Sequence, residues 1–164
     1  MTAYLGIDLG ERRIGVAIAD GPDVGARPLQ TLPRGRTIDA DIAALEALIE
    51  AHSVDVLVVG LPIDAAGHEG SQAEATRAWT AKVRARLGSR VEIGLRDERL
   101  SSHLAETRLG PMPRGRSGGP PSRRQRDTYR ARVDREAASI ILQDELDSRR
   151  ATPSVTNPTM ETRP

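Results

Sequence analysis

GIDLGERRIGVAIAD, residues 6–20, contains two short apolar runs that are joined by a glycine-containing turn. Ile14, Val16 and Ile18 alternate with smaller residues, which is typical of a β-strand. The stretch therefore predicts a β-hairpin whose first strand carries Asp8 at its end. Burying that carboxylate costs several kcal/mol without compensation, so we expect a partner charge or a cation beside it.

The rest of the chain alternates between strand-like and helix-like patterns. Two prolines in RPLQTLP (27–33) suit a strand at the edge of a sheet, and the apolar run VDVLVVG (54–60) suits a buried parallel strand. Ser71 to Glu74 form a capping-box sequence, and Ser101 or Ser102 is expected to cap a shorter helix. The expected strands are 3–8, 13–19, 27–33, 54–60 and 91–96, and the expected helices are 38–52, 71–87, 101–109 and 130–148.

This order predicts an α/β fold with a mixed five-stranded sheet. The sheet starts with an antiparallel hairpin, continues in parallel βα units and is flanked by helices. One domain would span residues 1–148. The segment at about 110–127 is rich in Arg, Gly and Pro and is expected to form a mobile loop, and residues 149–164 are expected to be a disordered tail.

The composition excludes several kinds of site. The 164 residues include no cysteine, so the chain has no disulfide, no thiol nucleophile and no cysteine-ligated zinc. No stretch approaches the roughly 18 apolar residues of a membrane span, and the N-terminus does not resemble a signal peptide, so we expect a cytoplasmic protein without membrane contact. One Trp, two Tyr and no Phe make nucleic-acid binding by aromatic base stacking unexpected.

Acidic residues follow two predicted strands and begin the last predicted helix. Asp8 ends the first strand, Asp97 and Glu98 follow the fifth, and Asp134 lies in the first turns of the helix. If the fifth strand flanks the first, Asp8 lies near Glu98, and carboxylates that meet without basic partners suit Mg²⁺ or Mn²⁺. The spacing equally allows turn residues, a favourable helix N-terminus for Asp134, or ion pairs with neighbouring arginines.

Basic residues gather before and within that last helix. Residues 108–135 contain nine arginines and two aspartates, a net charge of +7, which is typical of sequence-independent binding to a nucleic-acid backbone. The run also suits a solvated helix face. Gly60, Gly67 and Gly70 lie in a segment that either brings backbone N–H groups to a phosphate or is an ordinary βα loop.

Four blocks of the chain span about residues 4–147, and they are GIDLGERRIGVAIAD, VVGLPIDAAGHEGSQAE, DERLSS and VDREAASIILQDELD. In their sequence and their order, these blocks resemble the YqgF/RuvX family of RNase H-like nucleases. The resemblance implies an RNase H-like fold and a hydrolase acting on ester bonds. It implies a metal-dependent endonuclease for 5′-end maturation of pre-16S rRNA in ribosome biogenesis, or alternatively a Holliday junction resolvase that cuts branched DNA.

The same resemblance implies a catalytic and metal-binding triad of Asp8, Glu98 and Asp134, with Asp97 as the alternative middle ligand. Two Mg²⁺ or Mn²⁺ ions held by such carboxylates can activate water and stabilise the leaving oxygen of a phosphodiester. The residues expected to contact nucleic acid are Arg12, Arg13, Arg99, Arg114, Arg116, Arg123, Arg124 and Arg126. For Arg99, a salt bridge to Glu98 is the other interpretation.

Two departures from the family concern substrate fit. Asp64 stands where the family often has Asn, and the loop before Asp134 is longer than usual. A non-catalytic RNA-binding assembly factor is a second alternative, and an actin-like ATPase, suggested by GIDLG alone, would need a longer chain. Precursor rRNA or branched DNA is the expected partner, with a pre-ribosomal particle also considered. The sequence is compatible with a monomer and with a homodimer.

Overall fold

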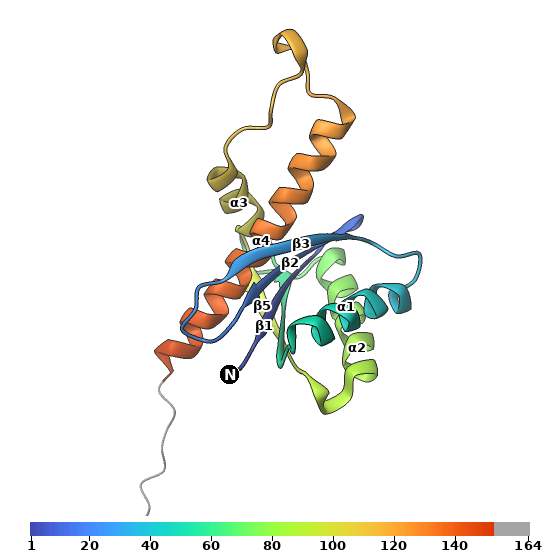
Figure 1. Ribbon diagram of the computed structural model, residues 1–164, viewed down its shortest axis with the longest axis vertical. Coiled ribbons are helices and arrows are strands. Elements are labelled where there is room, and N and C mark those ends of the chain that lie inside the picture. The colour runs from blue at the N-terminus through green and yellow to red at the C-terminus, as the bar shows by residue number, and fades with distance from the viewer. Residues whose placement is uncertain (153–164) are drawn as a thin grey trace, which may run out of the picture.

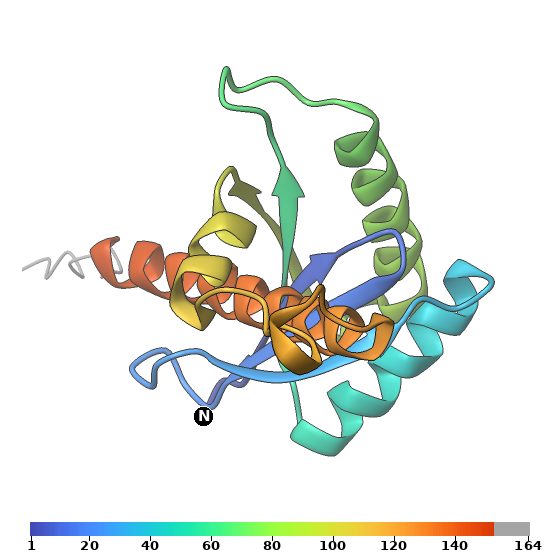
Figure 2. The same ribbon diagram turned by 90° about the horizontal axis from the view of Figure 1, so that it is seen from above.

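The computed structural model describes residues 1–152, and its centre is a five-stranded sheet in the order β3-β2-β1-β4-β5. The strands are β1 (Tyr4–Leu9), β2 (Arg13–Ala19), β3 (Arg27–Pro33), β4 (Val56–Pro62) and β5 (Glu92–Glu98). The helices are α1 (Ile38–His52), α2 (Ser71–Leu87), α3 (Ser101–Leu109) and α4 (Arg123–Ala151), with short 3₁₀ turns at Gly88–Arg90 and Arg116–Gly118. Helices α1 and α2 cover one face of the sheet, and α4 crosses the other face with α3 beside it (Figures 1 and 2).

The predicted mixed sheet is confirmed. Strands β1 and β2 form the antiparallel hairpin, in which Asp8 pairs with Gly15, and β3 is the edge strand beside β2. Strand β4 is parallel to β1, and β5 is parallel to β4. The expected neighbourhood of the first and fifth strands is wrong, because β4 lies between them.

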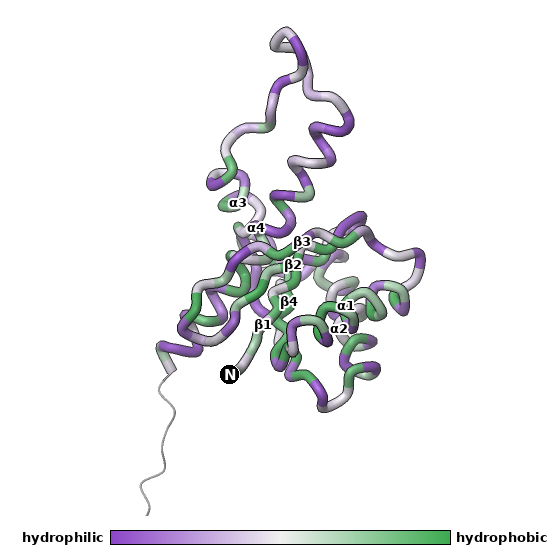
Figure 3. Tube along the Cα trace, in the orientation of Figure 1, coloured by the Kyte–Doolittle hydropathy of each residue, from purple (hydrophilic) through white to green (hydrophobic). Residues whose placement is uncertain are grey.

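Two apolar layers hold the sheet between its helices. On the side of α1 and α2, Leu5, Ile7, Ile14 and Val16 pack with side chains that include Trp79. On the side of α4, the layer is thinner and consists of small and branched residues from the strands with Ala138, Ile141, Leu142 and Leu146 of the helix. The apolar residues in Figure 3 accordingly follow the strands, whereas the projecting end of α4 and the loop before it are mostly hydrophilic.

Glycines allow α4 to lie directly on the sheet. A Cβ atom on Gly6 would come within 2.7 Å of the Ala138 carbonyl oxygen, and one on Gly15 would collide with the backbone of Asp134. Both glycines share the face of the sheet that carries Asp8, because side chains two residues apart in a strand point the same way. The close approach therefore brings Asp134 of α4 to the strand that pairs with Asp8.

The last helix is longer than expected at both ends. It begins at Arg123 rather than near residue 130, because Ser122 and Gln125 form a capping box in which each side chain accepts a hydrogen bond from the other residue's backbone N–H. Its first two turns are almost wholly polar and therefore lack the apolar periodicity that predicts a helix. At the other end it reaches Ala151, so part of the expected tail is helical, and residues 153–164 lie outside the described part of the chain.

Two predicted helix caps are wrong. The N-cap of α2 is the extended residue Gly70, and Ser71 is the first helical residue. The N-cap of α3 is Leu100, and the hydroxyl of Ser101 bonds to Glu98 instead of capping the helix. Within residues 1–152, no helix combines the length and the hydropathy needed to cross a membrane.

Candidate active site

Asp8 lies near the end of the central strand β1, on the face that α4 covers. Gly15 pairs with it on one side, and on the other side Gly60 follows the Val59 that pairs with Ile7. Its carboxylate has no hydrogen-bond or ion-pair partner among the described residues. Burial, and then the negative charges of Glu98 and Asp134, raise the pKa of Asp8 well above its ordinary value. The surroundings of Asp8 thus oppose its negative charge, as expected for a carboxylate that faces a cation site.

Glu98 ends β5 and reaches Asp8 across the intervening strand β4. The strand residue that it crosses is Gly60, where an added Cβ would lie 2.7 Å from Glu98 Oε2 and 2.6 Å from Cδ1 of Ile141. The hydroxyl of Ser101 donates a hydrogen bond to Glu98 Oε1. Burial raises the pKa of Glu98, and the Ser101 hydrogen bond opposes part of that shift. Gly60, predicted to lie in a phosphate loop, is therefore a strand residue that leaves room for the Glu98 side chain.

Asp134 comes to the site from α4. It lies in the middle part of this helix, well beyond the N-terminal turn, so a helix-dipole role is not supported by its position. Its Oδ2 accepts a hydrogen bond from Nε of Arg13 at 2.6 Å, and both side chains are partly buried. Arg13 thus gives Asp134 a neighbour of opposite charge. Asp8 and Glu98 have no such neighbour among the described residues.

Asp8, Glu98 and Asp134 together form what we call the acidic cluster. Its oxygen ligands fit a divalent cation, although the side chains do not form a complete ligand cage. Among residues 1–152, no group of three His, Cys, Asp or Glu side chains is arranged to hold one metal ion. Asp134 is engaged by Arg13, and Glu98 by Ser101. Oxygen ligands with unrelieved mutual repulsion at Asp8 are nevertheless the type that Mg²⁺ and Mn²⁺ prefer.

Asp97, the alternative middle ligand, has a different environment. It neighbours Glu98 in β5, so the two side chains point to opposite faces of the sheet. Asp97 accepts a hydrogen bond from Nε of Arg99 at 3.1 Å, and both side chains are about half exposed. The predicted salt bridge from Arg99 to Glu98 is therefore wrong, and Glu98 is the better placed middle residue.

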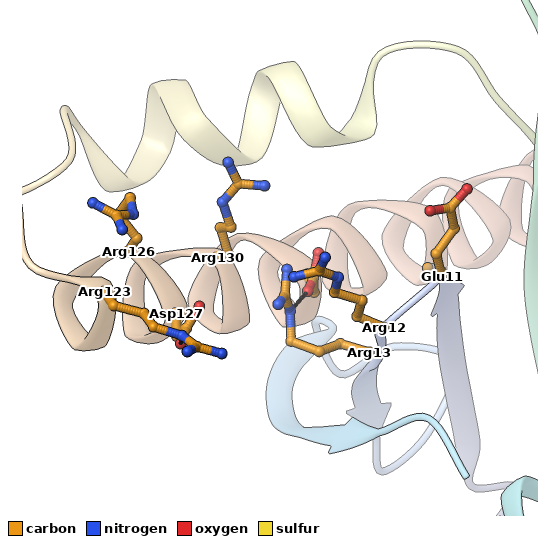
Figure 4. A pocket seen from close by; sticks show the side chains of 9 residues that line it. Glu11, Arg12, Arg13, Arg123, Arg126, Asp127 and Arg130 are labelled. Carbon is orange, nitrogen blue, oxygen red and sulfur yellow. Dashed lines mark hydrogen bonds and ion pairs between the residues drawn. The ribbon is translucent and has the colours of Figure 1, made fainter. Parts of the chain in front are cut away.

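A basic cleft of about 700 Å³ opens beside Asp134. One wall is the turn between β1 and β2, with Arg12 and Arg13, and the other is the first turns of α4 (Figure 4). Three arginines project from α4 one helical turn or so apart, and Asp127 of the same helix pairs loosely with the first of them. The α4 arginines of this basic cleft are Arg123, Arg126 and Arg130.

Four of the predicted nucleic-acid contacts line the basic cleft, and four do not. Arg99 is paired with Asp97, Arg124 lines a separate shallow pocket on α4, and Arg114 and Arg116 lie in the loop before α4. Arg130 was not among the predicted contacts. The signal for it was available, because residues four apart on a helix share a face and Arg126 precedes it by four.

The loop after β4 is held by its own side chains. Gly67 has a left-handed backbone with φ of 86°, and Gly70 caps α2. Asp64 accepts hydrogen bonds from the backbone N–H groups of Ala66 and His68, at 2.9 and 2.8 Å. The extra carboxylate that distinguishes this chain thus closes its own turn and is not drawn into the acidic cluster.

A buried ion pair behind the site was not predicted from the sequence. Asp41, at 1% exposure, accepts hydrogen bonds from Arg34 Nε at 2.8 Å, from the Gly35 N–H and from the Trp79 indole. Arg34 also donates to the carbonyl oxygen of Gly10, and its backbone N–H donates to that of Arg12. This network fixes the β1–β2 turn that presents Arg12 and Arg13 to the basic cleft.

Comparisons with known sequences agree with this architecture. The sequence profile of a family described as "RuvX: Holliday junction resolvase" matches residues 2–148. A relative from Anaeromyxobacter sp. (strain Fw109-5) is 44% identical over 148 residues, covering 90% of this chain and 98% of the relative. One from Synechocystis sp. is 39% identical over 150 residues, covering 91% and 90%. Both relatives carry the provisional name pre-16S rRNA nuclease.

Solved structures confirm the RNase H-like fold. A Thermus thermophilus RuvC structure in complex with a Holliday junction substrate superposes with a TM-score of 0.53 at 13% identity, covering 92% of this chain and 98% of that one. The fowlpox virus resolvase in complex with Holliday junction DNA gives 0.51 at 12% identity, covering 90% and 98%. At these identities the likeness concerns the fold alone.

Proposed function

Because the chain belongs to the RuvX family, we propose that it is a nuclease that hydrolyses phosphodiester bonds during 5′-end maturation of pre-16S rRNA. The observation that carries the proposal is Asp8. Its pKa is raised by burial and by the charges of Glu98 and Asp134, and Asp134 lines a cleft that also contains five arginines. An acidic centre next to a basic surface is what metal-dependent cleavage of a polyanion requires.

Asp8, Glu98 and Asp134 are the residues that would hold two Mg²⁺ or Mn²⁺ ions. When bound, such ions supply an activated water and charge stabilisation for the oxygen that leaves phosphorus. Asp97 remains the alternative to Glu98, but its pairing with Arg99 favours Glu98.

The other side chains bind and orient the substrate and the acids. Ser101 donates a hydrogen bond to Glu98 and holds one carboxylate oxygen, so that the other faces Gly60 and the sheet centre. Arg13 holds Asp134, and it can exchange that carboxylate for a substrate phosphate once cations neutralise the acids. Arg12, Arg123, Arg126 and Arg130 would contact flanking phosphates along the basic cleft.

Branched DNA is the second candidate substrate, because the matching family profile is described as a Holliday junction resolvase. Cutting two strands of a junction symmetrically needs a homodimer, whereas trimming one rRNA strand can be done by a monomer. We propose a cytoplasmic protein that acts on precursor rRNA, within or outside a pre-ribosomal particle, and the single acidic centre of one chain suffices for that reaction.

The test is a side-by-side cleavage assay with a 16S precursor RNA and a four-way DNA junction. Each is incubated with Mg²⁺, Mn²⁺ or EDTA, using the natural protein, Asp8→Asn and the control Glu50→Gln, an exposed carboxylate on α1. We expect metal-dependent RNA cleavage that Asp8→Asn reduces at least about a hundredfold and Glu50→Gln leaves unchanged.

Other outcomes of this assay discriminate the alternatives. Paired symmetric cuts in the junction would replace the rRNA substrate with branched DNA. Salt-dependent binding without cleavage of either substrate at any metal concentration would leave a non-catalytic assembly factor. Full cleavage by Asp8→Asn would exclude the acidic cluster as the catalytic centre.

A further inference from the structure

A second pocket, of about 470 Å³, opens on the other side of the acidic cluster from the basic cleft. It shares Glu98 and Ser101 with the site, and we call it the leucine pocket after Leu100 and Leu104 at its rim. The basic cleft adjoins Asp134, whereas the leucine pocket adjoins Glu98. A nucleic-acid strand whose cleaved bond lies at the acidic cluster would therefore contact one surface on the 5′ side of that bond and a different surface on the 3′ side.

The rim of the leucine pocket is apolar and exposed. Leu100 is 62% exposed and Leu104 is 47% exposed, and the backbone N–H of Leu104 donates to the Leu100 carbonyl, so both lie on one face at the start of α3. Behind them, Ile140 and Ile141 of α4 are almost fully buried and line the inner wall. Apart from Met1 and Val24, these two leucines are the large exposed apolar side chains of residues 1–152.

The charges of the leucine pocket disfavour phosphate. Its two arginines are already paired, Arg96 with Glu145 at 3.4 Å and Arg99 with Asp97 at 3.1 Å. Glu98 is assigned to the cations by the proposed function, and the exposed Asp144, which no cation pairs among the described residues, leaves the pocket with a further carboxylate. A neutral group with a flat apolar surface and N–H donors at its edge suits both the leucines and Asp144.

Resting on the proposed nuclease function, we propose that the leucine pocket binds the nucleobase next to the cleaved bond, on the side opposite the basic cleft. A base inside a helical stack cannot enter the pocket, so this nucleotide must be unpaired or be pulled out of its pair. Phosphates then bind on the Asp134 side of the acidic cluster, and an unstacked base binds on the Glu98 side. The arrangement selects single-stranded or frayed nucleic acid at one defined position.

The experiment uses oligonucleotides around the cleavage position, each with one base replaced by an abasic ribose. For the natural protein we expect cleavage to fall about tenfold when the base that enters the leucine pocket is missing. We expect little change when the base on the other side of the cleaved bond is missing. The double variant Leu100→Ser, Leu104→Ser should lose about the same factor on the intact strand and nothing further on the abasic one. Val24→Ser, equally apolar and 47% exposed but in the β2–β3 loop, is the matched control.

Several results would overturn the base pocket. One is equal sensitivity of the natural protein and the double variant to the missing base. Another is a change of oligomeric state in the double variant, measured by sedimentation, which would assign the leucines to an interface between copies of this chain. Binding of the same oligonucleotides with the metal chelated separates the two proposals. Equal affinities of both proteins there would exclude the base pocket, whereas absence of cleavage alone would exclude only the nuclease.

Discussion

Asp8 is a residue whose charge the folded chain opposes. Its pKa is raised above the ordinary value, so at acidic pH the folded protein retains a proton that the unfolded chain releases. The contribution of Asp8 to the stability of the metal-free protein therefore falls as pH rises from the unfolded pKa, about 4, to the raised folded value, and is constant above it. Burial, and then the charges of Glu98 and Asp134, raise this pKa, and bound cations would offset both effects, which gives the residue a second, metal-dependent signature.

We expect Asp8→Asn to stabilise the metal-free protein by about 1 kcal/mol or more at neutral pH, and to leave it unchanged below about pH 4. Thermal unfolding of both proteins across this pH range measures the difference. Added Mg²⁺ or Mn²⁺ should stabilise the natural protein and not the variant, so that the order reverses. A natural protein that is the more stable one throughout, with or without metal, would contradict a repulsive carboxylate at this position.

Arg34 joins two parts of the chain through a buried charge. Removing it leaves the carboxylate of Asp41, fully buried, with only the Gly35 N–H and the Trp79 indole as donors. We expect Arg34→Ala to lower the free energy of unfolding by about 3 kcal/mol, measured by urea denaturation. Arg27→Ala removes an ion pair whose two side chains are more than half exposed, and it should cost less than about 1 kcal/mol. Equal effects of the two substitutions would mean that the burial of Asp41 is unimportant.

At the scale of elements, the contact between α4 and the sheet decides the site. Helix α4 carries Asp134, and its distance from Asp8 is set by how closely the helix backbone approaches β2 at Gly15. A shift of the helix by the width of one methyl group would separate these two acids. The glycine in β2 is therefore a structural requirement of the acidic cluster, although it carries no functional group.

Gly15→Ala tests this contact. The added methyl group meets the backbone of Asp134 and Arg135, so we expect a loss of about 2 kcal/mol or more in stability and a larger loss of cleavage activity. Gly94→Ala in β5 is the matched control, because a Cβ atom there has no neighbour within 4 Å. Denaturation and initial cleavage rates of both variants give the comparison. If the two variants behaved alike, the close approach of α4 would not be what holds the site together.

At the scale of the whole molecule, charge is distributed unevenly although the net charge is only +1. The arginines of α4 and of the β1–β2 turn face one another across the basic cleft, at the end of the sheet where the acidic cluster lies (Figure 4). Such a local field attracts a polyanion independently of its sequence and is screened by salt. Binding should therefore depend on this surface rather than on the overall charge.

The triple variant Arg123→Ala, Arg126→Ala, Arg130→Ala measures that surface. For single-stranded RNA, we expect the slope of log affinity against log salt concentration to become less steep by about 2, close to 0.7 for each lost phosphate contact. The control replaces Lys82, Arg84 and Arg86, three exposed basic residues of α2 on the far side of the sheet, and should leave the slope unchanged. A similar slope for both triple variants would place the RNA elsewhere on the molecule.

Local patterns in the sequence were sufficient to predict most elements of the fold. Alternation in residues 13–19 and the apolar run before Gly60 predicted the strands, because a strand is defined by its own residues and their burial. The motifs around Asp8, Glu98 and Asp134 predicted the family, which the comparisons confirm. Their roles as metal ligands stay a prediction. The start of α4 was misplaced because a polar helix that projects from the domain carries no apolar periodicity.

The tertiary structure alone decided how distant residues combine. Three features depend on strand order and on the spacing between layers. Strand β4 lies between β1 and β5, Gly60 leaves room for Glu98 to cross β4, and Gly15 leaves room for the backbone of α4. The pairing of Arg13 with Asp134 joins residues 121 positions apart in the chain. No local pattern encodes such contacts, because their free energy arises only when the sheet and the helix pack. The local sequence supplies the carboxylates and arginines, and the packing of α4 on the sheet brings particular ones together.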